Sequence, residues 1–501
     1  MRWFFVFIIV LWPAFGQAQS TPSAGDAGYL AQLLKDSLSD RGRMVEIFGF
    51  EGALSSKATI KQLTIADDDG IWITATGLVL DWQRSALLSG ELRVREFSAK
   101  SITMTRLPEG QPRQPGFEAK AFALPEIPLS ILIERVSAAE IILDKAVLGD
   151  AFLGTLQGDL ALNRDQKAAN LTLKRQDKDH PDRLDLALKF NPQTQDLDLN
   201  LTLAEGPNGL IATKLNIPNQ PDLLVSLRGA GPLANFSARF SLAAAGVTHL
   251  GGLVTIAKEV STADERTKGE NPTQRTRFNA RLEGDLRPLM SAHAGLFFGE
   301  KSKLDLQGHL GGAQRLTIDR LALHTKALAL TADLALGQDG VPKRFHVTGK
   351  ISGAEEQVLL PNLGGQAAQL KYAEIDLTFD AAQSDAWSGT LLLEGLSRPD
   401  VTADLLRLTG SGRILPSVSA TLGAVASGQF TAEAKGVHAQ PSSAFYLFGS
   451  DMNAAFETQW RQAEQSLRMS KISLESPNVR LAGQATLGLT GQLPLEMKAR
   501  L

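Results

Sequence analysis

The residue types that perform catalysis or bind metals are scattered thinly along this chain of 501 residues. The seven histidines stand singly and form no His-x-x-x-His or His-Glu pair, which a zinc site on a helix would need. Cysteine is absent, so thiol nucleophiles, sulfur-bound zinc and disulfides are excluded. No Gly-x-Ser-x-Gly turn and no Walker-type loop occurs. The sequence therefore predicts no enzyme, no cofactor and no metal centre.

Three segments have a chemical interpretation beside a structural one. Asp-Asp-Asp-Gly at 67–70 has oxygen ligands for calcium, but the further oxygens and the distant Glu of a calcium loop are missing, so a turn is predicted. GAGPLANFS at 229–237 resembles a phosphate loop, but a strand follows it where a helix N-terminus would have to hold the phosphate. A turn is predicted there too. Trp72 and Trp82 have the side chains of a carbohydrate platform, but in an apolar array we interpret them as wall or core.

Charge and the N-terminal segment restrict the partners and the compartment. The 51 basic and 54 acidic residues nearly cancel and no Lys/Arg run occurs, which excludes the basic footprint of a nucleic-acid-binding protein. Residues 1–18 are predicted to be a signal peptide or signal anchor, with Arg2, an apolar run and small residues near Ala18. No later stretch approaches 18 consecutive apolar residues. We therefore expect most of the chain outside the cytoplasm.

The remaining sequence is dominated by alternation with a period of two. Residues 28–40 are the exception, because Leu30, Leu33, Leu34 and Leu38 mark one face of an amphipathic helix. Segments such as RLDLALKF (183–190) and DLDLNLTL (196–203) then alternate apolar and polar residues, which is typical of antiparallel strands with one apolar and one wet face. Strands of about eight residues would number on the order of 35.

The interruptions of this pattern are few. Helices are predicted around 284–300 and 397–410, where Asp, Ser and Pro signal possible starts. The polar stretch 259–276 and the Pro/Gly-rich stretch 109–118 are predicted to be a loop and a linker. Residues 43–501 are therefore predicted to form one continuous elongated β region. Its alternation still continues at Leu501, so we expect the sheet to extend further.

Residues 48–109 resemble the N-terminal region of the TamB family of AsmA-like proteins. The matching features, in order, are the Leu-rich helix, Gly49-Phe50-Glu51-Gly52, the strand ATIKQLTI and the Asp-Gly turn. A strand containing Trp82, the segment SALLSG and a strand ending in RLP follow. Residues 280–350 resemble the middle of the family more loosely. The order and spacing of these features, rather than any single one, carry the resemblance.

The resemblance implies an all-β, antiparallel-rich elongated sheet curled into a half-pipe, or β-taco, with a hydrophobic groove. It implies a periplasmic protein, associated with the inner membrane at its N-terminus, that carries phospholipids between inner and outer membranes during outer-membrane biogenesis. The partner TamA would be met through a C-terminal part that this sequence lacks. The residues predicted to face phospholipid acyl chains are Leu78, Leu80, Leu186, Leu188, Leu199, Leu201, Phe236, Phe240, Leu306, Leu377 and Phe379.

Two alternatives stay open at this point. The chain is alternatively a translocation and assembly scaffold that helps outer-membrane β-barrel proteins and autotransporters to insert or be secreted, because β-augmentation needs only an exposed strand edge. A string of β-sandwich binding domains would show the same alternation.

Overall fold

Strands dominate the computed structural model, which is all-β with 70% strand, a single long sheet that is not closed, and few helices. This confirms the all-β part of the predicted fold class. The structure describes residues 44–52, 57–83, 85–86, 91–108, 130–163, 165–177, 181–260, 274–311, 314–353, 357–361, 367–415, 424–441, 443–461, 466–488 and 495–500. The predicted leader 1–18, helix 28–40 and linker 109–118 lie outside these residues. Among the described helices, none has the length and apolarity of a membrane span.

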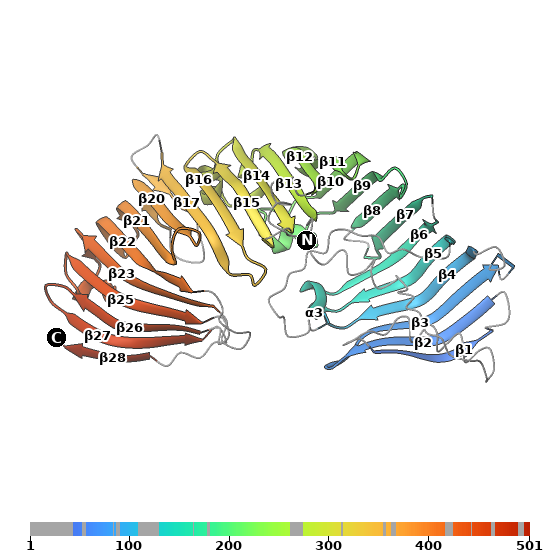
Figure 1. Cartoon of the computed structure of the whole chain (residues 1–501), viewed down its shortest axis with the longest axis horizontal. Helices are drawn as coiled ribbons and strands as arrows, with labels where there is room; N and C mark the ends of the chain where they lie inside the picture. The colour runs from blue at the N-terminus through green and yellow to red at the C-terminus, as the bar shows by residue number, and fades with distance from the viewer. Residues whose placement is uncertain are drawn as a thin grey trace. The chain divides into compact units, whose positions relative to one another are not determined.

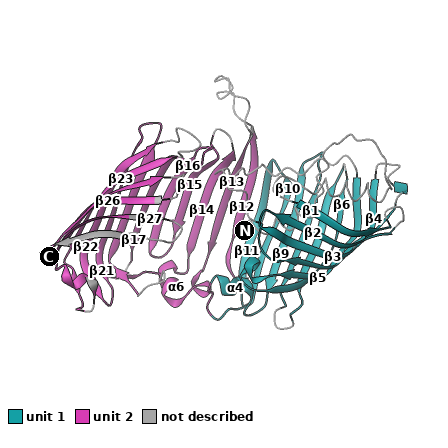
Figure 2. Ribbon diagram, turned by 90° about the horizontal axis from the view of Figure 1, so that it is seen from below, with its two compact units in different colours: residues 1–114, 122–215, 219–247 teal, residues 115–121, 216–218, 248–501 magenta. Residues whose placement is uncertain are grey.

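The chain divides into two compact units, coloured in Figure 2. Unit 1 comprises residues 1–114, 122–215 and 219–247, and unit 2 comprises 115–121, 216–218 and 248–501. Within each unit, the long strands lie side by side in chain order (Figure 1). Each unit is described separately below.

Unit 1 holds eleven strands and two short helices in its described residues. The strands are β1 (Met44–Glu51), β2 (Lys57–Asp67), β3 (Gly70–Gln83), β4 (Glu91–Met104), β5 (Ser130–Leu143), β6 (Phe152–Leu162), β7 (Lys167–Arg175), β8 (Arg183–Phe190), β9 (Asp196–Glu205), β10 (Leu223–Pro232) and β11 (Asn235–Ala244). The helices are α3 (Lys145–Leu148) and α4 (Leu210–Lys214). Strands β4 and β5 pair in parallel, and the other registered pairs are antiparallel.

Unit 2 holds the remaining strands. They are β12 (Val247–Val260), β13 (Gln274–Gly284), β14 (Ser302–Gly311), β15 (Leu316–His324), β16 (Leu328–Leu336), β17 (Pro342–Ser352), β18 (Val358–Leu359), β19 (Gln369–Leu370), β20 (Tyr372–Asp380), β21 (Ala386–Ser397), β22 (Val401–Leu415), β23 (Val425–Lys435), β24 (His438–Ala439), β25 (Met452–Arg461), β26 (Ser466–Glu475), β27 (Arg480–Gly488) and β28 (Leu495–Arg500). The helical elements are η2 (Arg287–Leu289), α6 (Ala292–Phe298) and η3 (Ala444–Leu447).

The strands are longer and fewer than the sequence predicted. The described residues form 28 strands, against an expectation on the order of 35 from strands of about eight residues. The difference arises because many strands exceed eight residues. β3, β4 and β5 have 14 residues each and β22 has 15.

One predicted helix is correct and one is wrong. The helix expected at 284–300 is present as η2 and α6, where Ser291 caps α6 by accepting from the Ala294 amide. The helix expected at 397–410 is instead the turn between β21 and β22 and most of β22. Val401 and Thr402 open that strand because β-branched residues suit a pleated surface. The Ser-Arg-Pro-Asp signal at 397–400 therefore marks a hairpin turn, closed by the Arg398 amide donating to the Val401 carbonyl at 2.9 Å.

The polar stretch 259–276 is only partly the loop that the sequence predicted. Its two ends are strand, because Glu259 in β12 pairs with Arg275 in β13. The two side chains form an ion pair with an N–O distance of 3.1 Å. Residues 261–273 lie outside the described part of the chain.

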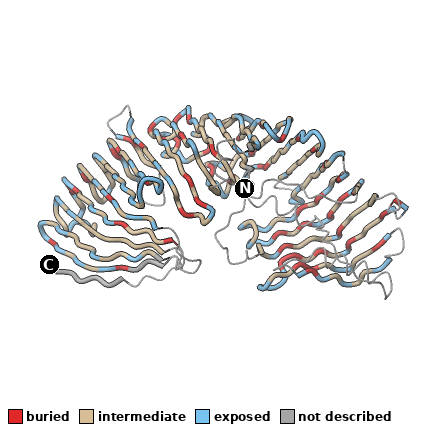
Figure 3. The backbone as a smooth tube through the Cα atoms, viewed as in Figure 1, coloured by how far each residue is buried: buried red, intermediate tan, exposed pale blue. Residues whose placement is uncertain are grey.

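Buried residues recur along the strands between half-buried and exposed ones, as Figure 3 shows. The largest cluster joins β1 to β6 of unit 1 and includes Val45, Ile73, Val136 and Ile141. Val147 and Leu148 of α3 pack against it. Smaller clusters follow further along the chain, around Phe236 in unit 1 and Phe297 in unit 2.

Candidate functional site: an apolar face of the sheet

Cross-strand pairing places apolar residues of unit 1 in one continuous row. Residues directly opposite each other on paired strands point to the same face of a sheet. From β2 to β11 the successive partners are Ala58, Leu80, Phe97, Val136, Gly158, Leu171, Leu186, Leu201, Leu227 and Phe240. A neighbouring row contains Leu160, Ala169, Leu188, Leu199, Gly229 and Ala238. We call the face that carries these rows the apolar face.

The alternation of β3 changes phase at Gly77. Ala75 before it and Leu78 after it are buried in the same cluster, although they stand at an odd spacing. The register with β2 and β4 is continuous across Gly77, so no extra residue is inserted there. Gly77 has a φ of 59°, a backbone conformation that side chains with a Cβ rarely adopt, and a Cβ on it would lie 2.9 Å from the Cβ of Lys100. This position therefore requires glycine, and its conformation keeps Leu78 and Leu80 on the apolar face.

The reverse face of unit 1 is polar. In β9, Asp198 is exposed and lies opposite exposed Lys189 of β8, on the side away from Leu199. Asp185 of β8 accepts from the guanidinium of Arg183 at 2.6 Å and from the Thr172 hydroxyl at 2.7 Å. The hydrogen bond from Arg183 lowers the pKa of Asp185 below its ordinary value, so this carboxylate stays charged on the wet side.

Unit 2 repeats this separation. From β12 to β25 its central row contains Val254, Ala280, Leu306, Leu321, Ala332, Val347, Leu377, Gly389, Gly410, Phe430 and Phe456. An adjacent row passes through Phe345, Phe379, Trp387, Gly412, Gly428 and Thr458. None of these residues is charged.

Most charges of unit 2 lie on the reverse side of the same strands, and the exposed Lys258 near the end of β12 is an exception on the side of Val254. Glu374 accepts from the Tyr372 hydroxyl at 2.8 Å and pairs with Lys350 at 3.0 Å. The Tyr372 hydrogen bond first, and Lys350 second, lower the pKa of Glu374 below its ordinary value. In unit 2, therefore, one face of the sheet is apolar and the reverse face carries most of the charged side chains.

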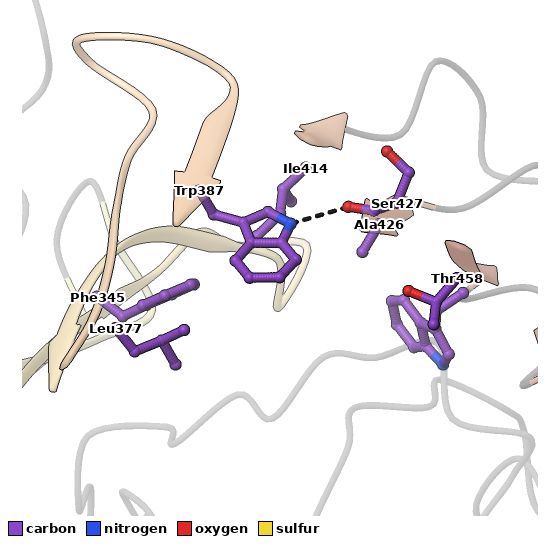
Figure 4. A pocket seen from close by; sticks show the side chains of 8 residues that line it. Phe345, Leu377, Trp387, Ile414, Ala426, Ser427 and Thr458 are labelled. Atoms are coloured by element: carbon purple, nitrogen blue, oxygen red, sulfur yellow. Dashed lines mark hydrogen bonds between the residues drawn. The ribbon is translucent and has the colours of Figure 1, made fainter. Parts of the chain in front are cut away.

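An aromatic hollow interrupts the apolar face of unit 2 (Figure 4). It has a volume of about 260 Å³ and is lined by Phe345, Leu377, Trp387, Ile414, Ala426, Ser427, Thr458 and Trp460. The ring centroids of Trp387 and Phe430 lie 5.5 Å apart. Phe430 in turn stacks on Phe456, with centroids 5.0 Å apart. The hollow thus lies beside a run of three adjacent rings.

Two glycines let these rings approach the backbone of the sheet closely. A Cβ on Gly410 would lie 2.7 Å from the Phe430 ring, and one on Gly428 would lie 2.7 Å from the Trp387 ring. The Trp387 indole is also fixed by its Nε1, which donates to the Ser427 carbonyl at 2.8 Å. The Trp387 ring is therefore held by packing over glycine and by a hydrogen bond.

The eleven residues predicted to contact lipid all belong to the apolar face of their own unit. Leu78, Phe236 and Phe379 are buried, and the other eight are half-buried. The structure brings eight of them together in unit 1 and three in unit 2. The sequence prediction missed Trp387, Phe430, Phe456 and Trp460, although each stands in an alternating segment such as AWSGTLLL or NAAFETQW.

The two segments that resembled a calcium loop (67–70) and a phosphate loop (229–237) contain the turns that the sequence predicted. Residues 68–69 form the predicted turn between β2 and β3, where Asp67 pairs with Arg106. The Arg106 guanidinium donates to Asp67 Oδ2 at 2.9 Å and to the Gly70 carbonyl at 2.7 Å. Residues 233–234 form the predicted turn between β10 and β11. In the described part of the chain, no group of three His, Asp or Glu residues is placed to hold a metal.

Trp72 and Trp82 are core residues, as predicted. Their exposed fractions are 4% and 7%, so neither ring forms an open platform. The indole Nε1 of each is buried without a hydrogen-bond partner in the structure. An unpaired buried donor costs free energy, so these two groups are weak points of an otherwise apolar core.

Glu205 is a buried carboxylate at the end of β9. It accepts from the backbone amides of Ile211 at 2.6 Å and Ala212 at 3.0 Å, in the first turn of α4. Burial outweighs these hydrogen bonds and raises the pKa of Glu205 above its ordinary value. Its role is to hold α4 against the end of the sheet.

Comparison with known proteins gives no match. No family model, no curated protein and no solved structure matches this chain.

Proposed function

We propose that this chain is a periplasmic carrier of phospholipids, acting in outer-membrane biogenesis between the inner and outer membranes. The observation that carries the proposal is the continuity of the apolar face. Directly paired residues run from Ala58 to Phe240 in unit 1 and from Val254 to Phe456 in unit 2. Most charged side chains lie on the reverse of the same strands.

An acyl chain gains free energy on such a surface. Burying one methylene is worth about 0.8 kcal/mol, so a chain of about 15 methylenes would gain about 12 kcal/mol if it were fully covered. That gain offsets most of the cost of leaving a bilayer. We propose that the sheet curls into a half-pipe, or β-taco, around this groove, because curling shields both the chain and the leucine rows from water.

The resemblance to the TamB family supplies the rest of the proposal. Residues 1–18 would associate the protein with the inner membrane, and TamA would be its partner at the outer membrane. No cofactor takes part, because sliding of a lipid along an apolar surface breaks no covalent bond.

Photo-crosslinking in living cells tests the proposal. A photoreactive amino acid at Leu199 should capture phospholipid, whereas one at the adjacent Asp198 should not, because the two side chains point to opposite faces. In unit 2, Leu377 and the exposed Thr378 form a second matched pair. Equal capture within each pair, or no lipid at either Leu199 or Leu377, would contradict the proposal.

A scaffold for outer-membrane protein assembly is the second candidate. One observation favours it: the sheet is not closed. An edge strand of an open sheet would accept a strand of an unfolded outer-membrane protein by β-augmentation. Crosslinks from Glu46 or Phe48 to outer-membrane proteins, with no lipid captured at Leu199, would favour this candidate.

A further inference from the structure

The apolar face differs in composition between the leucine rows of unit 1 and the aromatic hollow of unit 2. Around Leu199, the paired neighbours in its row are Leu188 and Gly229. The hollow instead has Phe345, Trp387 and Trp460 in its lining. A lipid chain would therefore meet two kinds of surface on the same protein.

The polar groups around the hollow restrict the ligand. The Trp387 Nε1 is already engaged with the Ser427 carbonyl at 2.8 Å (Figure 4). No charged residue lines the hollow, and its side-chain hydroxyls are those of Thr458 and of Ser427, which donates to the Arg413 carbonyl at 3.5 Å. A ligand with a charge or several hydrogen-bonding groups would lose its hydration without compensation. The surface fits an uncharged hydrocarbon.

The size of the hollow restricts the ligand further. Its volume of about 260 Å³ corresponds to about nine water-sized volumes of 30 Å³ each. A methylene is of similar size, so the hollow fits about half of one acyl chain.

We infer that the hollow formed by Phe345, Trp387, Ala426, Thr458 and Trp460 is a holding site for the distal part of one acyl chain. The inference rests on the proposed function and adds that lipid does not move uniformly along the face. Rings fixed over Gly410 and Gly428 contact the chain without first being ordered, which reduces the entropic cost of binding. Chains should therefore leave the hollow more slowly than they leave the leucine rows.

Fluorescence quenching by brominated lipid tests this inference on the full chain. One variant keeps Trp387 as its sole tryptophan, with the other five replaced by Phe. A second has all six replaced and carries Leu199→Trp. Both are mixed with vesicles of phosphatidylethanolamine and phosphatidylglycerol with dibrominated chains, and release is then followed after excess unbrominated vesicles are added. We expect quenching in both, with release about tenfold slower at Trp387.

Three substitutions identify the hollow as the cause. Ala426→Phe fills it and should weaken quenching of Trp387 about tenfold, as expected for losing contact with about two methylenes. Gln429→Phe adds the same ring on the reverse face and should change nothing. Thr458→Val removes the hydroxyl while keeping the shape, and should leave quenching unchanged or stronger. Strand content measured by circular dichroism shows that each variant is folded.

The outcomes separate the holding site from the proposed function. Equal release rates at both tryptophans, together with no effect of Ala426→Phe, overturn the holding site and leave lipid binding intact. Weaker quenching in Thr458→Val also overturns it, because the ligand would then need the hydroxyl. Absence of quenching at both positions contradicts the proposed function itself.

Discussion

Replacing Gly428 by alanine should destabilise unit 2, because the new Cβ would clash with two aromatic rings. The new Cβ would lie 2.7 Å from Trp387 Cζ2 and 2.8 Å from Phe430 Cε2. Real Cβ atoms do not approach other carbons so closely, so at least one ring must move. The Trp387 ring cannot move freely, because its Nε1 donates to the Ser427 carbonyl at 2.8 Å.

The expected size of the effect follows from two opposing contributions. Overpacking a formed core costs about 1–3 kcal/mol. Alanine loses less backbone entropy than glycine on folding, which returns about 0.5–1 kcal/mol. The net loss of unfolding free energy therefore lies between about 0 and 2.5 kcal/mol, with a central value of about 1 kcal/mol. For a unit of roughly 250 residues, the central value corresponds to a fall in Tm of about 2–4 °C.

Thermal unfolding followed by circular dichroism measures this fall, and Gly295→Ala provides the matched control. Gly295 lies inside α6, and a Cβ there would lie 3.4 Å from Arg287 Cα, an ordinary contact. Because glycine is unfavourable within a helix by about 0.5–1 kcal/mol relative to alanine, this variant should have a raised Tm.

A double-mutant cycle decides whether the ring is responsible. In a Trp387→Leu background, the cost of Gly428→Ala should shrink, since the indole that it displaces is gone. A cost that is the same in both backgrounds, or a wild-type Tm for Gly428→Ala alone, would refute the packing of Trp387 on Gly428.

Three further predictions concern unit 1. Because burial raises the pKa of Glu205, its contribution to stability is present below the unfolded pKa of about 4.3 and is lost as pH rises through the folded pKa. Glu205→Gln should therefore flatten the fall in Tm as the pH rises above about 4. Trp72→Phe removes an unpaired buried N–H together with some packing, so urea unfolding should place it within about 1 kcal/mol of wild type. A truncation of Trp to Ala costs roughly 3–5 kcal/mol of unfolding free energy. A loss of that size for Trp72→Phe would contradict an unpaired N–H. Arg106→Met removes the charge partner of the buried Asp67 carboxylate, which should cost about 3–5 kcal/mol, and adding Asp67→Asn should recover part of that loss in the same titration.

The face of each strand could be predicted where the alternation is uninterrupted. Leu186 and Leu188 are two residues apart, as are Leu199 and Leu201, and a strand places such residues on one side. The sequence also predicted Leu78 and Leu80, but the reason they share a face with Ala75 is the left-handed backbone conformation of Gly77. Nothing in the local pattern distinguishes that glycine from one in a regular strand.

The aromatic hollow could not be predicted, because it depends on which strands become neighbours. Phe345 in β17 and Trp460 in β25 are far apart in the sequence, and both line the same hollow. The helix wrongly expected at 397–410 has a local cause. Leu405, Leu406 and Leu408 fit a helical spacing as well as a strand, and only pairing with β21 and β23 decides between them.

The alternating hairpins also determine how this protein can change in length during evolution or design. Leu310, Leu316, Leu336 and Pro342 form one cross-strand row, so β14 ends and β17 begins at the same margin of the sheet. Deleting β15 and β16 together would join these ends and set Leu306 beside Val347, with the apolar face preserved. Deleting one residue, or one strand, would reverse the faces or the chain direction of everything that follows. The sheets of related proteins should therefore differ in length by whole hairpins. A protein shortened in this way would keep its apolar and polar faces but would have a shorter sheet.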